Sequence, residues 1–277
     1  MESDFDRITF YDISMRPPTE VHCCSPNPWK TRYALNFKDV SYSTSWVPLP
    51  SISKVRRGLD LPATRKFADG SDFYTLPIIS DPSTNSIVGD SFDIAVYLQQ
   101  TYPNSGAGNL LPPQKLDYTF SQNQALAVPL SNRTAAGFEE YAQFNINVDA
   151  AFTTHVLLMV QNLPFDPATA EQSKTESLRR AGLTNWADLD IHGAAREQLL
   201  NSFQDALAEL AKLYEKDPSG PFVLGTQPSY ADCIVGGWLR MSSVCLPASE
   251  WEQLRGWHDG VFGRLHDTLQ EEFGQMN

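Results

Sequence analysis

The first residues of the chain alternate between strand-like and helix-like patterns of apolar side chains. Ile8–Ile13 is rich in β-branched and aromatic residues, and Tyr42–Val47 alternates apolar and polar positions, as strands do. Between them Trp29, Tyr33 and Phe37 recur at four-residue spacing, which places three aromatic rings on one face of a helix. This order predicts a β-α-β unit at the start of the chain.

Two further strands and a helix complete this half. The runs Thr75–Ser80 and Ser86–Val88 flank the turn-forming residues Asp81–Asn85, as the two arms of a hairpin would. A helix is expected from Ser91 to about Thr101. The stretch between the second strand and the hairpin is expected to be irregular or helical. The predicted unit is therefore βαβ-ββα.

Beyond residue 101 the apolar pattern is helical. The stretch 102–113 is rich in Gly, Pro, Asn and Ser, which predicts a linker. We therefore expect an α/β domain over 1–101, a linker over 102–113 and an all-helical domain over 114–277. The helices of the last domain are expected at Ala142–Val160, Leu199–Tyr214, Ser229–Val244 and Trp251–Phe273.

Composition and charge narrow the classes of function. The 277 residues are 42% hydrophobic and 19% charged, which fits globular domains. With 21 basic and 33 acidic residues the net charge is −12, which disfavours nucleic acid and anionic membrane surfaces as partners. Residues 1–101 hold 10 basic and 12 acidic side chains, and residues 102–277 hold 11 and 21, so most of the deficit lies in the helical half.

The sequence also carries signals about compartment and metals. Residues 1–6 lack the basic start and apolar run of a secretory signal, and no stretch approaches the roughly 20 apolar residues that span a bilayer. An even count of cysteines permits disulfides, but a chain of this size does not need them. Neither the histidines nor the cysteines have metal-binding spacing. We expect a cytoplasmic protein without a metal, and reduced thiols at Cys23, Cys24, Cys233 and Cys245.

Three segment starts carry candidate chemistry. Ser25-Pro-Asn-Pro28 begins the first helix, where free N–H groups and the helix dipole would favour an anion such as a thiolate. Leu76-Pro77 opens a strand, where proline removes a ladder donor and could be cis. Asp90 and Ser91 precede the last helix of the unit, which offers a second anion site beside an acceptor for an ammonium group. The simpler interpretation is a helix cap, formed by Ser25 or Asn27 at the first helix and by Asp90 or Ser91 at the last.

The order of these motifs resembles that of the thioredoxin-like domain of glutathione transferases. Ser-Pro at the first helix, Leu-Pro at the third strand and Asp-Ser at the last helix match that family's pattern. Ser229-Tyr-Ala-Asp232 is similar to the buried capping box of the family's helical domain, which is a folding device. The runs Ser25–Asn36 and Tyr74–Thr84 look most like the fungal FuA class, which is related to bacterial lignin β-etherases.

The resemblance implies a glutathione transferase fold and a serine-type enzyme. Ser25 would donate a hydrogen bond to the glutathione thiolate and so lower the pKa of the thiol. Asn27 would share or replace that role. The backbone of Leu76, before a cis Pro77, would bind the cysteinyl amide of glutathione.

The two charged ends of glutathione would need further partners. Asp90 and Ser91 would take the γ-glutamyl ammonium and carboxylate. The glycine carboxylate needs a cation, and residues 54–66 hold five basic residues and one acidic residue, a net charge of +4. Arg65 and Lys66 are the expected candidates, although a solvated basic surface would explain the same cluster.

Alternatives remain open at the sequence level. Cys24 would support a rival mechanism in which a protein thiolate forms a mixed disulfide with glutathione. The second substrate, a hydrophobic aromatic electrophile, would lie between the domains near aromatic residues, most of which are expected to be core. These residues are Tyr118, Phe120, Phe138, Tyr141, Phe144 and Phe152.

The resemblance is also compatible with other activities. These are cleavage of aryl β-ethers, a ligandin that binds plant or wood polyphenols without turnover, and an assembly module without catalysis. The family implies detoxification chemistry and a homodimer.

Overall fold

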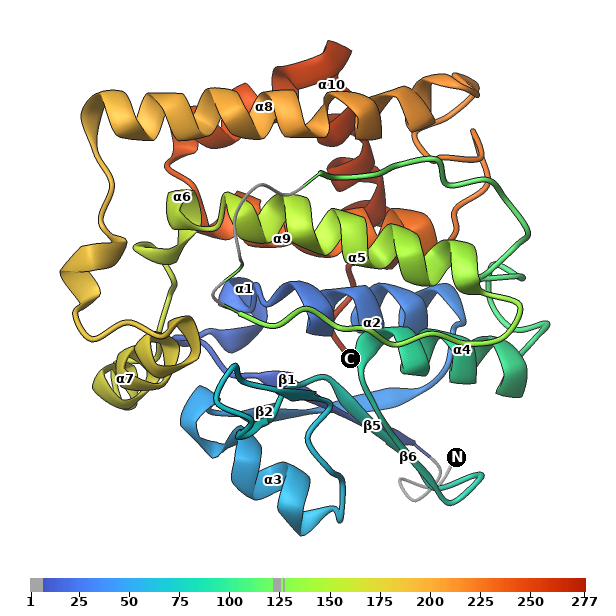
Figure 1. Ribbon diagram of the computed structural model, residues 1–277. Coiled ribbons are helices and arrows are strands. Elements are labelled where there is room, and N and C mark those ends of the chain that lie inside the picture. Colours follow the sequence, from blue (N-terminus) through green and yellow to red (C-terminus); the bar gives the residue numbers. More distant parts are fainter. Residues whose placement is uncertain (1–6, 122–125, 127) are drawn as a thin grey trace.

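A four-stranded sheet lies at one end of the molecule, with most helices of the second half stacked above it (Figure 1). The computed structural model describes residues 7–121, 126 and 128–277. The sheet order is β2-β1-β5-β6, with β1 and β2 parallel and the other neighbouring pairs antiparallel. Its strands are β1 (Ile8–Ile13), β2 (Tyr42–Val47), β5 (Ile78–Asp81) and β6 (Ser86–Gly89).

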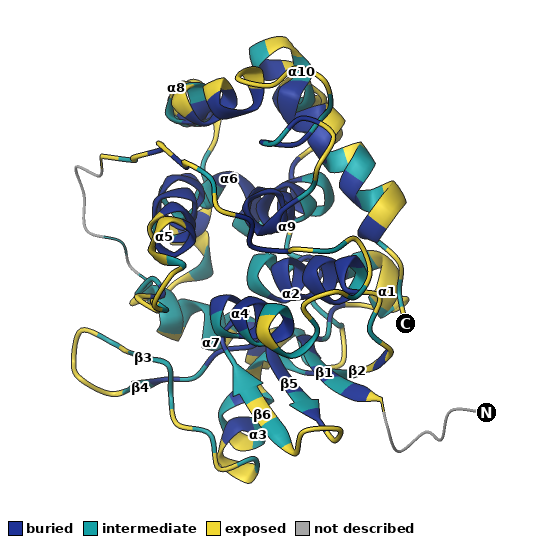
Figure 2. Cartoon of the chain, turned by 90° about the vertical axis from the view of Figure 1, so that its right-hand side faces the viewer, coloured by how far each residue is buried: buried dark blue, intermediate teal, exposed yellow. Residues whose placement is uncertain are grey.

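Helices cover both faces of this sheet. Helices α2 (Pro26–Phe37) and α4 (Ser91–Thr101) lie on the face toward the second half, and α3 (Ile52–Gly58) lies on the opposite face (Figures 1 and 2). The predicted βαβ-ββα order is confirmed. The stretch predicted as irregular or helical contains a 3-10 turn at Leu49–Ser51, α3 and a small hairpin of β3 (Arg65–Lys66) and β4 (Asp72–Phe73). A short helix, α1 (Thr19–His22), precedes α2.

The second half is helical, as expected. Helix α9 lies at its centre and packs against α2, α5 and α10, so the core continues from one half into the other. No helix of the described residues is long and apolar enough to cross a bilayer. The helical elements are α5 (Glu139–Thr154), α6 (Leu157–Val160), α7 (Ala170–Ala181), a 3-10 turn (Trp186–Leu189), α8 (Gly193–Glu215), α9 (Tyr230–Cys245) and α10 (Ala248–Phe273).

The helix predicted over Ala142–Val160 is in fact two helices. Helix α5 ends at Thr154 and α6 begins at Leu157. The imidazole Nδ1 of His155 lies 2.6 Å from the carbonyl oxygen of Ala151, which would accept from the His155 backbone in a continuous helix. The backbone N–H of His155 donates instead to Phe152, three residues back. A side chain that competes for its own helix acceptor therefore explains the break.

The helix predicted over Trp251–Phe273 is also interrupted. Residues Trp257–Gly260 leave helical geometry, and His258, Asp259 and Gly260 have positive φ angles. Asp and Gly adopt this left-handed region more readily than most residues, which favours a tight turn here. Arg255 and Asp267 pair across the turn at 2.6 and 2.8 Å, which holds the two helical parts together.

Candidate functional site

The predicted site segments emerge at one end of the sheet. Tyr11, near the end of β1, pairs with Ile78 at the start of β5, and Ile78 pairs with Gly89 at the end of β6. Three connections therefore lie side by side at this edge: the one from β1 to α2, the one that enters β5, and the one from β6 to α4. This register brings the Ser25, Leu76–Pro77 and Asp90–Ser91 segments to the same edge.

Ser25 stands at the N-cap position of α2, but its side chain makes no capping hydrogen bond. Its residue is half-buried, and the next residues are two prolines separated by Asn27. Pro26 and Pro28 have no N–H, so Asn27 supplies the one backbone donor of the first three helical positions. The simpler interpretation, a serine that caps its helix, is wrong in this structure. A hydroxyl and an N–H remain beside the positive end of the helix dipole.

The strand β5 begins after a cis peptide bond between Leu76 and Pro77, as expected. The preceding carbonyl, that of Thr75, accepts at 2.9 Å from the buried guanidinium of Arg56. Arg56 also donates to the Pro62 carbonyl and packs under Gly89, where a Cβ atom would approach it within 2.9 Å. The hydrogen bonds of Arg56 to these carbonyl groups therefore stabilise the backbone at this edge of the sheet.

Asp90, directly before α4, is a buried acidic residue with a strained backbone. It is 3% exposed and has a φ angle of +126°, a region that a residue with a side chain seldom adopts. Its carboxylate caps the helix by accepting from the Phe92 N–H at 3.0 Å. Ser91, the next residue, is buried as well. Strain of this kind is concentrated at functional sites.

Of the two cations chosen from the sequence, Arg65 is the one that reaches Asp90. Its guanidinium lies 3.9 Å from the Asp90 carboxylate, and its side chain is 10% exposed. Its Nε is buried without a hydrogen-bond partner among the described residues. Lys66 instead pairs with Asp72 and is largely exposed. Consecutive residues of a strand point to opposite faces, which explains why the two cations separate.

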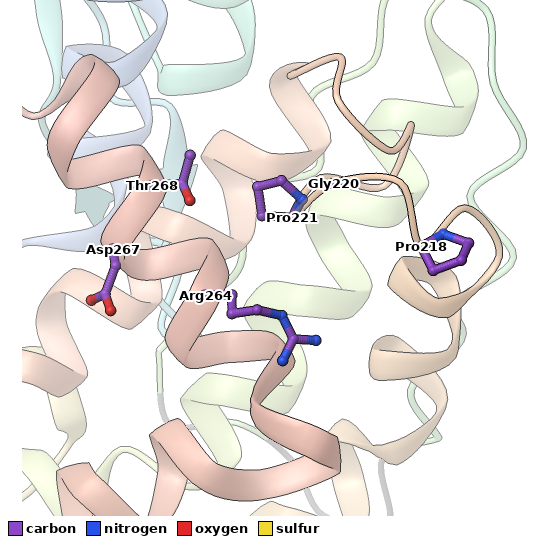
Figure 3. Close-up of a pocket in the computed structure, with 6 residues that line it drawn as sticks. All are labelled: Pro218, Gly220, Pro221, Arg264, Asp267 and Thr268. Carbon is purple, nitrogen blue, oxygen red and sulfur yellow. The ribbon is translucent and has the colours of Figure 1, made fainter.

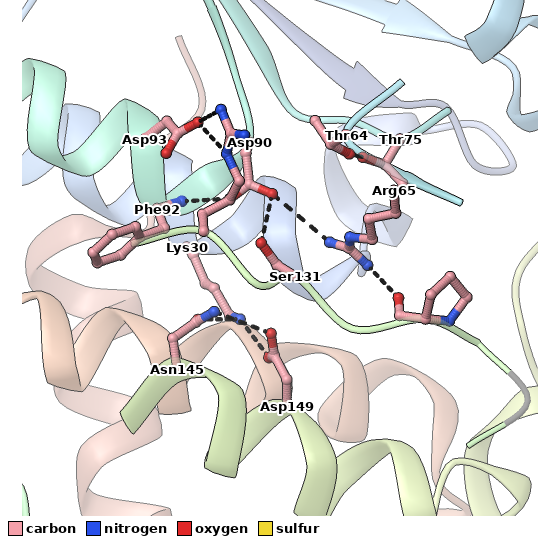
Figure 4. A network of polar contacts seen from close by, with 12 residues as sticks. Lys30, Thr64, Arg65, Thr75, Asp90, Phe92, Asp93, Ser131, Asn145 and Asp149 are labelled. Carbon is pink, nitrogen blue, oxygen red and sulfur yellow. Dashed lines mark hydrogen bonds and ion pairs between the residues drawn. The ribbon is translucent and has the colours of Figure 1, made fainter. Parts of the chain in front are cut away.

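Three residues of the second half also reach this edge, and the sequence analysis did not single them out; Figure 4 shows one of them, Ser131, beside Asp90. Ser131 donates to the Asp90 carboxylate at 2.9 Å, and the Pro129 carbonyl accepts from Arg65 at 2.9 Å. Arg133 donates to Asp93, in the first turn of α4, at 2.6 Å. No periodicity or motif marks these residues, because they lie in a segment without helix or strand.

Lys30 is a further residue that the sequence analysis did not single out. It is fully buried on α2 and donates to Asn145 at 2.8 Å and to Asp149 at 2.5 Å, both on α5 (Figure 4). The indole N–H of Trp238 on α9 donates to the same Asp149 oxygen at 2.6 Å. Burial lowers the pKa of Lys30, whereas the Asp149 carboxylate raises it. Its only sequence signal was a charge next to Trp29 in an aromatic helix.

Cys24 is poorly placed for thiol chemistry. It is fully buried, and its sulfur lies 3.7 Å from that of Cys245 at the end of α9. The contact with Cys245 and burial raise the pKa of Cys24 well above its usual 9.0. The thiolate is the reactive form, so this environment opposes the rival mechanism. The other cysteines are buried too, and all four thiols are free.

Most of the aromatic residues proposed for the second substrate belong to the core. Tyr118, Tyr141, Phe144 and Phe152 are buried, whereas Phe120 and Phe138 are only partly buried against that core. Within the described residues, no group of three or more His, Cys, Asp or Glu side chains is placed to hold a metal ion.

One hollow of the surface lies away from these segments. It has a volume of about 420 Å³ and sits between α10 and the turn at residues 218–221, which connects α8 to α9 (Figure 3). Its one acidic residue, Asp267, is already paired with Arg255. None of the predicted site residues lines it. The lining residues are Pro218, Gly220, Pro221, Arg264, Asp267 and Thr268.

Comparison with known proteins gives a consistent result. Family models for the glutathione S-transferase N-terminal and C-terminal domains match residues 24–101 and 157–272. The glutathione S-transferase-like protein ustS of Aspergillus flavus is 26% identical over 97% of this chain and 92% of its own length.

Solved structures of fungal enzymes resemble the chain over nearly its whole length. A glutathione S-transferase of Ceriporiopsis subvermispora, solved in complex with glutathione, is 28% identical with a TM-score of 0.76, over 96% of this chain and 97% of that one. The glutathione transferase GSTFuA3 of Phanerochaete chrysosporium is 25% identical with a TM-score of 0.76, over 98% of both chains. The predicted fold and the resemblance to the FuA class are confirmed.

Proposed function

The chain belongs to the glutathione S-transferase family, and we propose that it is a serine-type enzyme that activates glutathione as a thiolate. The thiolate would attack hydrophobic aromatic electrophiles. The observation that carries this proposal is the Ser25 hydroxyl at the start of α2, which makes no capping hydrogen bond to its helix. The solved relative from Ceriporiopsis binds glutathione, which supports glutathione as the co-substrate here.

The chemistry at Ser25 follows from two donors and a dipole. The Ser25 hydroxyl would donate a hydrogen bond to the sulfur, and the Asn27 N–H and the end of the α2 dipole would favour its negative charge. Each of these interactions is stronger with the thiolate than with the thiol, so together they lower the pKa of the thiol. Ser25 thus stabilises the nucleophile and is not itself one. The Asn27 side chain is a second candidate donor.

The γ-glutamyl end of glutathione would lie at the start of α4. Asp90 would accept from the ammonium group, and Ser91 with the first turn of α4 would take the carboxylate. The sequence analysis expected Arg65 or Lys66 to bind the glycine carboxylate. Because Arg65 is held beside Asp90, with a buried Nε that has no partner among the described residues, we assign it instead to the γ-glutamyl end. The backbone of Leu76 would pair with the cysteinyl unit between the two ends.

The test replaces Ser25 by alanine and follows conjugation of glutathione to an activated halonitroarene. A hydrogen bond to a charged group contributes about 1.5–3 kcal/mol, so kcat should fall about 10- to 100-fold. The pKa of bound glutathione, measured from its thiolate absorbance, should rise by about 1–2 units. Glutathione affinity should change little. Asn27→Ala, measured in parallel, shows how far that side chain shares the role.

Ser53→Ala is the matched control, since Ser53 is a half-buried helical serine on α3, which lies on the other face of the sheet. Equal kinetics and equal thiol pKa values in the Ser25 and Ser53 variants would refute the serine-type mechanism. Binding of glutathione and of a fluorescent dye, without turnover of any electrophile, would favour the ligandin. Release of a phenol from an aryl β-ether would favour ether cleavage. A homodimer and a cytoplasmic location complete the proposal.

A further inference from the structure

Helix α9 of the second half holds the turn that leads to Ser25. The guanidinium of Arg240 donates to the Val21 carbonyl at 2.6 Å and to the Cys23 carbonyl at 3.3 Å. It also lies over the indole ring of Trp29, 4.8 Å from the ring centre. These contacts join the helical half to the backbone two and four residues before Ser25.

The same turn is anchored from its own helix. The Trp29 indole N–H donates to the Cys23 carbonyl at 2.8 Å, so this one oxygen accepts from both halves of the molecule. One turn earlier on α9, a Cβ atom on Gly237 would come within 2.5 Å of the Pro26 carbonyl. The backbones of α9 and α2 are therefore in close contact directly after Ser25. Helix α9 therefore contacts the chain both before Ser25, through Arg240, and after it, at Gly237.

Arg240 is also a source of positive charge at this turn. Its partners are carbonyl oxygens and a ring, and no carboxylate among the described residues forms an ion pair with it. Burial raises the pKa of Cys23 to about 12, and the charge of Arg240 opposes that rise, as it does for Cys24. An anion at Ser25 would lie next to the same charge.

The buried charged and titratable groups that share this environment do not form an ion pair with Arg240 among the described residues. Asp12 and Arg32 lie beneath the turn and pair with each other at 2.8 Å. The charge of Arg240 also acts on Tyr33 of α2 and His266 of α10. Burial raises the pKa of Tyr33 and lowers that of His266, which favours the neutral form of each.

We propose that Arg240 is a positioning residue for catalysis: it holds the turn that presents Ser25, and its charge favours a thiolate bound there. This inference rests on the proposed role of Ser25. Arg240 would act from the second half of the chain without touching glutathione, so its loss should affect the thiol rather than the affinity for glutathione.

Two substitutions separate the charge from the hydrogen bonds. Arg240→Gln keeps N–H donors but removes the charge, and Arg240→Lys keeps the charge. For the Gln variant we expect a fall in kcat of about tenfold and a rise of about one unit in the pKa of bound glutathione, with the KM for glutathione within about threefold of the parent protein. The Lys variant should restore kcat to within about threefold.

Arg255→Ala is the control for a purely structural effect, since Arg255 also packs over a tryptophan, Trp251, and pairs with Asp267. It should lower the melting temperature and leave the thiol pKa unchanged. The proposal is wrong if Arg240→Gln behaves like Arg255→Ala, or if the Lys variant loses as much activity as the Gln variant. Ser25→Ala is measured beside them: if only it shifts the thiol pKa, the Arg240 inference alone fails, and if neither shifts it, the serine-type mechanism fails.

Discussion

At the scale of single residues, Asp90 combines a strained backbone with a buried carboxylate at the proposed glutathione site. A residue with a side chain at such a φ angle costs about 1–3 kcal/mol, which glycine would avoid. Three partners hold the carboxylate: the Phe92 N–H, the Ser131 hydroxyl and the nearby Arg65. The strained backbone thus keeps a buried acceptor at the edge where the γ-glutamyl ammonium is proposed to bind.

Asp90→Asn should therefore weaken glutathione binding more than catalysis. The amide keeps the size and one acceptor for the helix cap but loses the charge. A hydrogen bond between charged partners contributes about 1.5–3 kcal/mol, so the KM for glutathione should rise about 10- to 100-fold. At saturation kcat should stay within about threefold. Steady-state kinetics with varied glutathione measure both.

Asp93→Asn is the matched control, because Asp93 lies on the same helix and pairs with Arg133, two residues after the Ser131 that contacts Asp90. An unchanged KM in the Asp90 variant, or an equal rise in the Asp93 variant, would contradict the assignment of Asp90 to the ligand.

At the scale of elements, the capping box of α9 determines where the central helix begins. The buried Asp232 carboxylate accepts from the backbone N–H and hydroxyl of Ser229 at 2.8 and 3.0 Å, and from the Val223 N–H at 2.9 Å. The sequence predicted this box, and the structure confirms it. Because α9 carries Gly237 and Arg240, the start of this helix also positions the turn before Ser25.

The capping box makes a prediction about pH. Burial raises the pKa of Asp232 from its usual 3.8 to about 6. A carboxyl group with a raised pKa in the folded state stabilises the fold below pH 4 and loses that contribution as the pH rises toward and through 6. Asp232→Asn does not titrate, so its deficit in unfolding free energy should be larger at pH 4 than at pH 7, by up to about 3 kcal/mol.

Urea unfolding of both proteins across this pH range measures the difference. Asp217→Asn serves as the comparison, since Asp217 is an exposed carboxylate that accepts from the Ser219 N–H in a surface turn. A deficit for the Asp232 variant that does not depend on pH would contradict the buried titration.

At the scale of the whole molecule, the two halves share one core and one buried ion pair. Lys30 from the first half and Asp149 from the second are each nearly inaccessible, with side-chain exposures of 0% and 5%. A buried pair contributes little net stability compared with apolar side chains, but the loss of one partner leaves a charge without compensation. The pair therefore favours the docked arrangement of the halves in which each of these charges meets its partner.

Lys30→Met should lower the free energy of unfolding by about 3–5 kcal/mol, because it removes the counter-ion of the buried Asp149 carboxyl group. The double variant Lys30→Met with Asp149→Leu should recover much of that loss. Lys212→Met is the control, since Lys212 pairs with Glu209 on an exposed helix face and should change stability little. Equal losses in the single and double variants would show that packing rather than charge dominates here.

Local features of the fold were accessible from the chain alone because they depend on neighbours within one or two turns. The period of apolar positions predicted β1, β2 and α2, and the spacing of Ser229 and Asp232 predicted the start of α9. The breaks at His155 and at Trp257–Gly260 were missed, since a helical apolar period continues through them. A side chain that turns back on its helix and a left-handed turn leave no trace in that period.

Contacts between distant segments had to come from the folded structure. Ser25, Leu76 and Asp90 were predicted as site residues from short motifs, and the strand register explains why they share an edge. Arg65 was separated from Lys66 by the direction in which each side chain leaves its strand. Lys30 and Asp149, 119 positions apart, meet only when α2 docks on α5, as Arg240 meets Cys23 only when α9 docks on α2. Short motifs determine the local geometry of the chain, because they act through neighbouring residues. The partner of a buried charge is determined by how whole helices and strands pack.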